Sequence, residues 1–226
     1  MSDKDQPEFP PADTRTKLVE TKERWARDNR YQSGLTIRPE ARRERLPPGQ
    51  HEVKNWPVLD LGNVQEIDPA TWELVVDGAV EAPQRWSWAD FLALPQIDTV
   101  SDIHCVTTWS RYDNRWQGVG ALEVLARVRP RPEARHVLFH SYDGYTTNLK
   151  LSAFASEDVL LAHQWEGQPL TPAHGGPVRV VVPQLYFWKS AKWLQRIEFL
   201  TLDQPGFWEV RGYHNEADPW LEERYG

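Results

Sequence analysis

The apolar residues of this chain fall into short runs, and proline, glycine or aspartate ends nearly every run. Helical patterns are equally brief: residues 89–92, which Ser87 could cap, and residues 121–128. Many short strands with a few short helices predict an α+β fold rather than a helical bundle or an alternating α/β sheet. The strand-like runs are residues 72–76, 97–103, 137–139, 146–151, 159–161, 178–182 and 196–200.

The composition fits a single folded domain of 226 residues. Hydrophobic residues make up 40% of the chain, enough for a sizeable core. No apolar run approaches the ~20 residues that a transmembrane helix needs, so no membrane span is expected. A net charge of −7 and a pI near 5.5 argue against nucleic acid as a partner, because phosphates require a basic face.

The N-terminal part differs from the rest. Residues 1–13 are polar and proline-rich, and a weakly amphipathic helix is predicted from residue 14 to about residue 31. We expect residues 1–45 to form a polar tail with a peripheral helix, and residues 46–226 to form the domain. No apolar export segment follows Arg42 and Arg43, which predicts a cytoplasmic protein.

Cys105 is the only cysteine. A disulfide, a four-cysteine iron–sulfur cluster and a Cys-x-x-Cys redox pair are therefore excluded within the chain. Cys105 follows a strand-like run at the start of a predicted loop, where a thiol can serve as a ligand or a nucleophile. The residues alone leave open the alternative of a buried cysteine that packs like a small apolar side chain.

A second candidate site is a basic segment in an acidic protein. Residues 174–197 contain no acidic side chain but four cations, Arg179, Lys189, Lys192 and Arg196. Two glycines directly after His174 could let backbone amides approach a bound anion such as a phosphate. A solvated basic loop beside a buried strand is the alternative.

These motifs resemble the molybdenum domain of the sulfite oxidase family, which also includes the periplasmic methionine sulfoxide reductase catalytic subunit. The resemblance covers roughly residues 46 to 225. Its most specific part is His-Gly-Gly-Pro-Val-Arg at 174–179 followed by Lys-Ser-Ala-Lys-Trp at 189–193, which resembles the family's pterin-binding segment. Cys105 falls where the family has its molybdenum-ligating thiolate.

The resemblance implies an α+β fold with mixed sheets and short helices around a buried molybdenum–molybdopterin cofactor. It makes Cys105 the metal ligand, and it places Tyr213 and Lys54 at the substrate pocket as catalytic residues. The cofactor contacts that it implies are Asn55, Trp56, Asp143, His174, Arg179, Ser190, Ala191 and Lys192.

The expected activity is transfer of an oxygen atom to or from a small substrate, either sulfite-like or an S- or N-oxide. Lys54 and Trp56 stand where sulfite oxidases carry arginine and histidine, so we expect a different pocket. The haem and C-terminal dimerisation domains of animal sulfite oxidases are missing, so electrons should pass to a separate protein or acceptor, and a monomer is the simplest expectation. Two alternatives stay open: a thiol hydrolase that uses Cys105, and a noncatalytic module that binds an anion.

Overall fold

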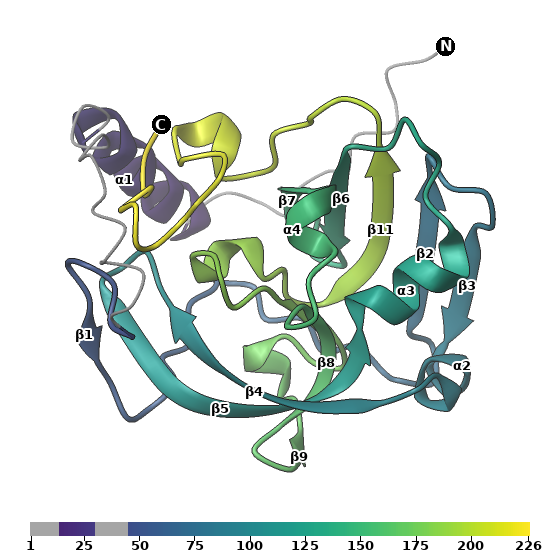
Figure 1. Cartoon of the computed structure of the whole chain (residues 1–226). Helices are drawn as coiled ribbons and strands as arrows, with labels where there is room; N and C mark the ends of the chain where they lie inside the picture. Colours follow the sequence, from purple (N-terminus) through teal and green to yellow (C-terminus); the bar gives the residue numbers. More distant parts are fainter. Residues whose placement is uncertain (1–13, 30–44) are drawn as a thin grey trace.

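The computed structural model describes residues 14–29 and 45–226, which form two mixed β-sheets with short helices (Figure 1). The first sheet contains β1 (His51–Glu52), β4 (Ile97–His104), β5 (Trp109–Gly120), β8 (Leu160–Trp165), β9 (Gln168–Pro169) and β10 (Arg179–Val181). The second contains, in spatial order, β3 (Gln84–Ser87), β2 (Glu73–Gly78), β11 (Leu194–Leu200), β6 (His136–Ser141) and β7 (Thr146–Lys150). The helices are α1 (Thr14–Asn29), α2 (Trp88–Ala93), α3 (Ala121–Val128) and α4 (Leu151–Phe154).

Both sheets mix parallel and antiparallel pairs. β1 runs parallel to β5 and β11 parallel to β2, while the remaining pairs are antiparallel. The predicted α+β fold with mixed sheets is therefore confirmed.

Two apolar cores hold these layers together. Alternate residues of β2, β6 and β11 enter the first core, because successive side chains of a strand point to opposite faces. Val124 and Val128 of α3, one turn apart, close this core. The second core lies on the other side of the first sheet and contains Cys105, Trp116 and Tyr213. Three candidate residues, Trp56, Cys105 and Tyr213, thus belong to the second core.

Most of the predicted elements are present. Helix α3 has the predicted bounds, and Ser87 caps α2 in a capping box with Asp90. The longest strand, β5, was not predicted: its polar sequence WSRYDNRWQGVG carries the Asp-Asn pair typical of a turn. Pairing with β1, β4 and β8 stabilises this strand instead.

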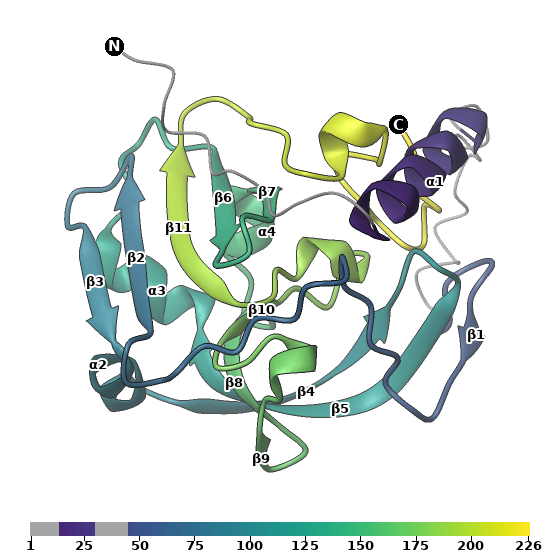
Figure 2. The ribbon, with the colours of Figure 1, turned by 180° about the vertical axis from the view of Figure 1, so that it is seen from behind.

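Helix α1 lies beside the C-terminal segment, as the views from both sides show (Figures 1 and 2). Helix α1 covers residues 14–29 of the predicted helix, and the tail 1–13 and residues 30–31 lie outside the described residues. None of the helices in the described ranges is long and apolar enough to cross a bilayer.

Candidate active site

A cavity of about 190 Å³ lies where loops of both sheets meet α1 and the C-terminal segment. Its wall draws on six separated stretches of chain, and the segment between β1 and β2, visible in Figure 2, supplies one of them. Eight of the eleven predicted site residues line it: Trp56, Cys105, Asp143, His174, Arg179, Ser190, Lys192 and Tyr213.

Cys105 places a thiol at this cavity directly after β4. Its residue is 6% exposed, and its sulfur lies 3.1 Å from the Thr107 hydroxyl. Burial raises the pKa of the Cys105 thiol, although the Thr107 hydrogen bonds and the charge of Lys22 oppose the shift. A protonated buried thiol is a poor nucleophile, whereas a metal ion at this sulfur would deprotonate it.

Arg179 and Lys192 bring positive charge to the same cavity. The Arg179 guanidinium is 1% exposed and donates to the carbonyls of His174 (2.8 Å) and Ser190 (2.8 Å). Lys192 donates to the Ala173 carbonyl at 2.7 Å. Burial lowers the pKa of Arg179 to about 9 and, together with the charge of Arg179, the pKa of Lys192 to about 8.

Neither cation forms an ion pair with a carboxylate of the described residues. A buried charge without a counter-charge is costly, and an anion bound in the cavity would supply one. These two residues therefore fit the anionic part of a ligand.

His174 and Trp56 form one aromatic wall. Their rings stack with centroids 4.0 Å apart and an interplanar angle of 21°, and the Arg179 guanidinium lies 5.3 Å from the Trp56 ring. Burial lowers the pKa of His174. The hydrogen bond to the Trp56 carbonyl opposes this shift, and the nearby charges of Arg179 and Lys192 add to it. The imidazole is therefore neutral at neutral pH.

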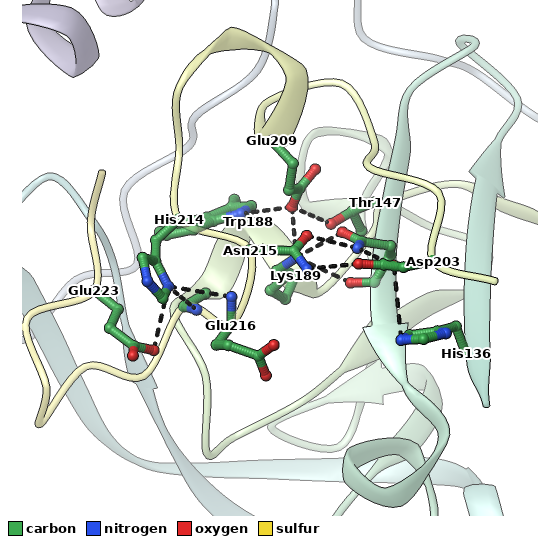
Figure 3. A network of polar contacts seen from close by, with 12 residues as sticks. His136, Thr147, Trp188, Lys189, Asp203, Glu209, His214, Asn215, Glu216 and Glu223 are labelled. Atoms are coloured by element: carbon green, nitrogen blue, oxygen red, sulfur yellow. Dashed lines mark hydrogen bonds and ion pairs between the residues drawn. The ribbon is translucent and has the colours of Figure 1, made fainter. Parts of the chain in front are cut away.

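The basic segment divides into two parts, and only one faces the cavity. Lys189 is 0% exposed and its ammonium pairs with Glu209 at 2.7 Å (Figure 3), and neither residue lines the cavity. Arg196 lies on β11 and pairs with Asp77 and Glu198. Lys189 and Arg196 are thus structural, which corrects the expectation that all four cations of the segment form one anion site.

The Lys189–Glu209 pair fixes two walls of the cavity to each other. The same Glu209 oxygen accepts from Thr147 (2.9 Å) and from the Trp188 indole (3.0 Å), while Lys189 also donates to Asn148 (Figure 3). Trp188 and the residue after Lys189 both line the cavity, and Glu209 follows Trp208 of the opposite wall. This buried network positions both walls.

The prediction that the backbone amides of Gly175 and Gly176 approach a bound anion is wrong. The amides of Gly175 and Gly176 donate to the carbonyls of Pro172 and Thr171, so they are not available to a ligand. Glycine is required here for close packing. A Cβ on Gly175, at φ +96°, would lie 2.8 Å from the Lys192 side chain, and a Cβ on Gly176 would lie 2.2 Å from the Leu170 carbonyl oxygen.

Tyr213 reaches the cavity from the C-terminal segment and is 4% exposed. Burial, with smaller contributions from Tyr225 and Cys105, raises the pKa of its phenol, so the hydroxyl stays protonated at neutral pH. Asp143, in the turn between β6 and β7, lines the cavity and accepts from the Tyr145 amide at 2.9 Å.

Three predicted site residues do not line the cavity. The side chains of Lys54 and Asn55 are exposed, and Lys54 contributes only its carbonyl, to Arg111. Ala191 is 1% exposed within the first core, where its carbonyl accepts from the Val180 amide.

Sequence reasoning missed the contribution of α1. Leu18 and Lys22, one helical turn apart, line the cavity from this helix. The four-residue spacing of Leu18 and Lys22 could have indicated a helix face directed toward the domain. The charged residues around them led instead to the prediction of a peripheral helix. Only the folded chain brings this helix to Cys105.

The residues fit a metal-bearing anionic cofactor. No group of three or more His, Cys, Asp or Glu side chains within the described part of the chain could hold a metal ion, so a metal here takes Cys105 and completes its ligands from a cofactor. The soft thiolate suits a transition metal, and Arg179 and Lys192 suit an anionic group. Fold and site thus define a class: a mixed-sheet domain whose cavity, with one buried thiol and two cations, fits a metal-bearing anionic cofactor.

Comparison with known proteins places the chain within this class. Residues 61–208 match the family described as oxidoreductase molybdopterin binding domain. The oxidoreductase YuiH of Bacillus subtilis (strain 168) is 47% identical over 182 residues, which cover 80% of this chain and 92% of that protein. The chain belongs to this family, the sulfite oxidase family of molybdenum oxidoreductases, and its cofactor is molybdenum–molybdopterin.

More distant relatives are longer. The protein-methionine-sulfoxide reductase catalytic subunit MsrP of Ralstonia nicotianae is 29% identical, with 69% of this chain and 53% of that protein covered. The NADPH nitrate reductase of Neurospora crassa is 33% identical, with 67% and 20% covered. The chain therefore spans about half of MsrP and a fifth of the nitrate reductase.

A solved structure has the same fold. The sulfane dehydrogenase SoxCD of Paracoccus pantotrophus superposes with a TM-score of 0.59 at 20% identity, covering 70% of this chain and 46% of that chain.

Neither alternative from the sequence holds. The family is one of oxidoreductases, which argues against a noncatalytic module. For a thiol hydrolase, a histidine should contact the sulfur, but among the described residues the hydrogen-bond partner of the Cys105 sulfur is Thr107, and the His104 ring contacts Ser110.

Proposed function

We propose that this protein transfers an oxygen atom between molybdenum–molybdopterin and a small substrate, and that it works in the reducing direction on an S-oxide or a related oxo compound. The observation that carries the proposal is the meeting in one cavity of a buried thiol, a tyrosine hydroxyl and two cations, the buried Arg179 and the half-buried Lys192, neither of which pairs with a carboxylate of the described residues. Relatives named as a methionine sulfoxide reductase subunit and a nitrate reductase support the direction, since both names describe reduction of an oxo compound.

In this proposal each residue has a separate role. When bound, the cofactor supplies the two-electron chemistry that accompanies oxygen transfer. Cys105 holds the metal, and Arg179 and Lys192 bind the anionic part of the cofactor, while the His174 ring, whose Nε2 faces the Trp56 carbonyl at 3.4 Å, packs beside them. Tyr213 donates a hydrogen bond to the substrate oxygen from a hydroxyl that burial keeps protonated. The rings of Trp56 and Trp188, which both line the cavity, exclude water.

Electrons would come from a separate protein. Cys105 is the only cysteine, so the chain cannot ligate an iron–sulfur cluster with four cysteines or carry a Cys-x-x-Cys-His haem attachment. The relative MsrP is named as a catalytic subunit, which fits an arrangement with a partner. A cytoplasmic location stays a prediction.

The test is a cofactor analysis followed by an activity screen. Protein purified from a molybdopterin-producing host is assayed for molybdenum and pterin, then given reduced dye with S-oxides, N-oxides or nitrate, and oxidised dye with sulfite. We expect stoichiometric cofactor and reduction of at least one S-oxide, with Cys105→Ser inactive. Molybdenum-replete protein that oxidises sulfite alone would contradict the direction, and metal-free protein with a rapidly alkylated Cys105 would contradict the proposal as a whole.

A further inference from the structure

Helix α1 is attached to the cavity wall through one face. Ala26 is 0% exposed, Val19 packs against the second core, and Glu23 pairs with Arg211 at 3.0 Å. Leu18 and Lys22 belong to the same face, since residues four apart lie above one another on a helix, and both line the cavity. The helix is thus fixed with a lysine directed inward.

Lys22 differs from the other cavity cations in its contacts with the described residues. Arg179 and Lys192 donate to backbone carbonyls, whereas the Lys22 ammonium forms no hydrogen bond or ion pair with any described residue and lies 6.0 Å from the centroid of the Trp208 ring. Burial lowers the pKa of Lys22, and the charge of the Cys105 sulfur opposes that shift. Lys22 therefore lines the same cavity as Cys105 and reaches it beside Trp208.

The cations occupy two places in the cavity. Arg179 and Lys192 interact with each other and lie by His174, where they fit the cofactor. Lys22 stands beside Trp208 and interacts with Cys105, the proposed metal ligand. A lysine near the proposed metal ligand would be placed to contact a substrate that approaches the metal.

We propose that Lys22 of α1 binds the substrate of this site, and that the substrate carries negative charge on the group that enters beside Cys105. This inference rests on the proposed function and adds the substrate class: a small oxyanion, or an oxo compound with an anionic group. Lys22 lies outside residues 61–208, the part of the chain that matches the family. In this proposal helix α1, rather than Lys54, provides the cation of the substrate pocket.

The experiment uses the molybdenum-replete full chain and four proteins: the parent, Lys22→Met, Lys22→Arg, and Lys17→Met as a matched control. Lys17 is an exposed lysine on the same helix. Sulfate, a non-reacting oxyanion, serves as the binding probe by calorimetry. KM and kcat are measured with an anionic and a neutral oxo substrate, and molybdenum and pterin are quantified in each variant.

We expect Lys22→Met to raise the sulfate Kd, and the KM of the anionic substrate, about 10- to 100-fold, since a hydrogen bond to a charged group is lost. The kcat and the KM of the neutral substrate should change little. Lys22→Arg should retain most of the sulfate affinity, which shows that the helix remains in place, and Lys17→Met should match the parent.

Three results would overturn the inference. These are a sulfate Kd of Lys22→Met within twofold of the parent, an equal rise in Lys17→Met, and loss of pterin from Lys22→Met, which would make Lys22 a cofactor contact. A different result would refute the proposed function alone. If the parent protein binds sulfate through Lys22 but turns over no oxo compound, the proposed activity is wrong and the anion-binding role of Lys22 is retained.

Discussion

The buried ion pair between Lys189 and Glu209 gives the sharpest stability prediction. Their side chains are 0% and 1% exposed, and the two groups lie 2.7 Å apart. Glu209→Gln keeps an oxygen for Thr147 and Trp188 but leaves the Lys189 ammonium buried without a counter-charge. Lys189→Met leaves the Glu209 carboxylate in the same position.

The size of the effect follows from burial. Removing one partner of a buried pair costs about 3–5 kcal/mol, because the other charge remains uncompensated. For a chain of this length that corresponds to a fall in Tm of about 6–20 °C. The double variant Lys189→Met/Glu209→Gln has no uncompensated charge, so its cost should be smaller than the sum of the single costs by about 1–3 kcal/mol.

The assay is thermal and urea unfolding, at one pH, of the parent, the two single variants and the double variant. Lys150→Met is the matched control, because Lys150 pairs with Glu216 at 2.8 Å at the surface, with side chains 53% and 42% exposed. Its removal should cost about 0–1 kcal/mol. Single variants that cost less than Lys150→Met, or a double variant equal to the sum, would refute the role given to the pair.

Further predictions concern the cavity itself. Tyr213→Phe should slow turnover about 10²–10⁴-fold with molybdenum content unchanged, and a rate within twofold of the parent in steady-state kinetics would mean that Tyr213 only packs. Arg179→Ala or Lys192→Ala should weaken cofactor retention by about 1.5–3 kcal/mol each, more in the double variant, and full pterin occupancy of the double variant after dialysis would refute the anion site. In cofactor-free protein the pKa of Lys192 is about 8, so this cation is lost as pH rises through 8 and sulfate affinity should fall. Calorimetry at pH 7 and pH 9 checks this, and Lys192→Met should show a smaller fall; equal falls in both proteins would contradict the assignment.

Local sequence patterns predict much of the fold but little of how its segments meet. Helices α2 and α3 could be found because their caps and apolar spacing lie within a few residues. Strand β5 could not, because its polar residues are stabilised by three neighbouring strands rather than by local preference.

The candidate site divides in the same way. Cys105, His174, Arg179, Lys192 and Tyr213 were found through motif resemblance, and the fold brings them to one cavity. The different fates of the four cations in the basic segment could not be predicted, because Glu209, the partner of Lys189, and Asp77, one of the two partners of Arg196, are distant in sequence. Lys22 was missed for the same reason: its surroundings come from tertiary packing of α1.

The central claim is that Cys105 ligates molybdenum in this cavity. X-ray absorption at the molybdenum edge of the parent and of Cys105→Ser tests it most directly, because the variant replaces a soft sulfur donor with a hard oxygen donor at one position. We expect the variant to retain pterin, to lose one sulfur from the metal's coordination shell and to gain an oxygen or nitrogen ligand. An identical sulfur shell in both proteins would remove Cys105 from the metal and contradict the account.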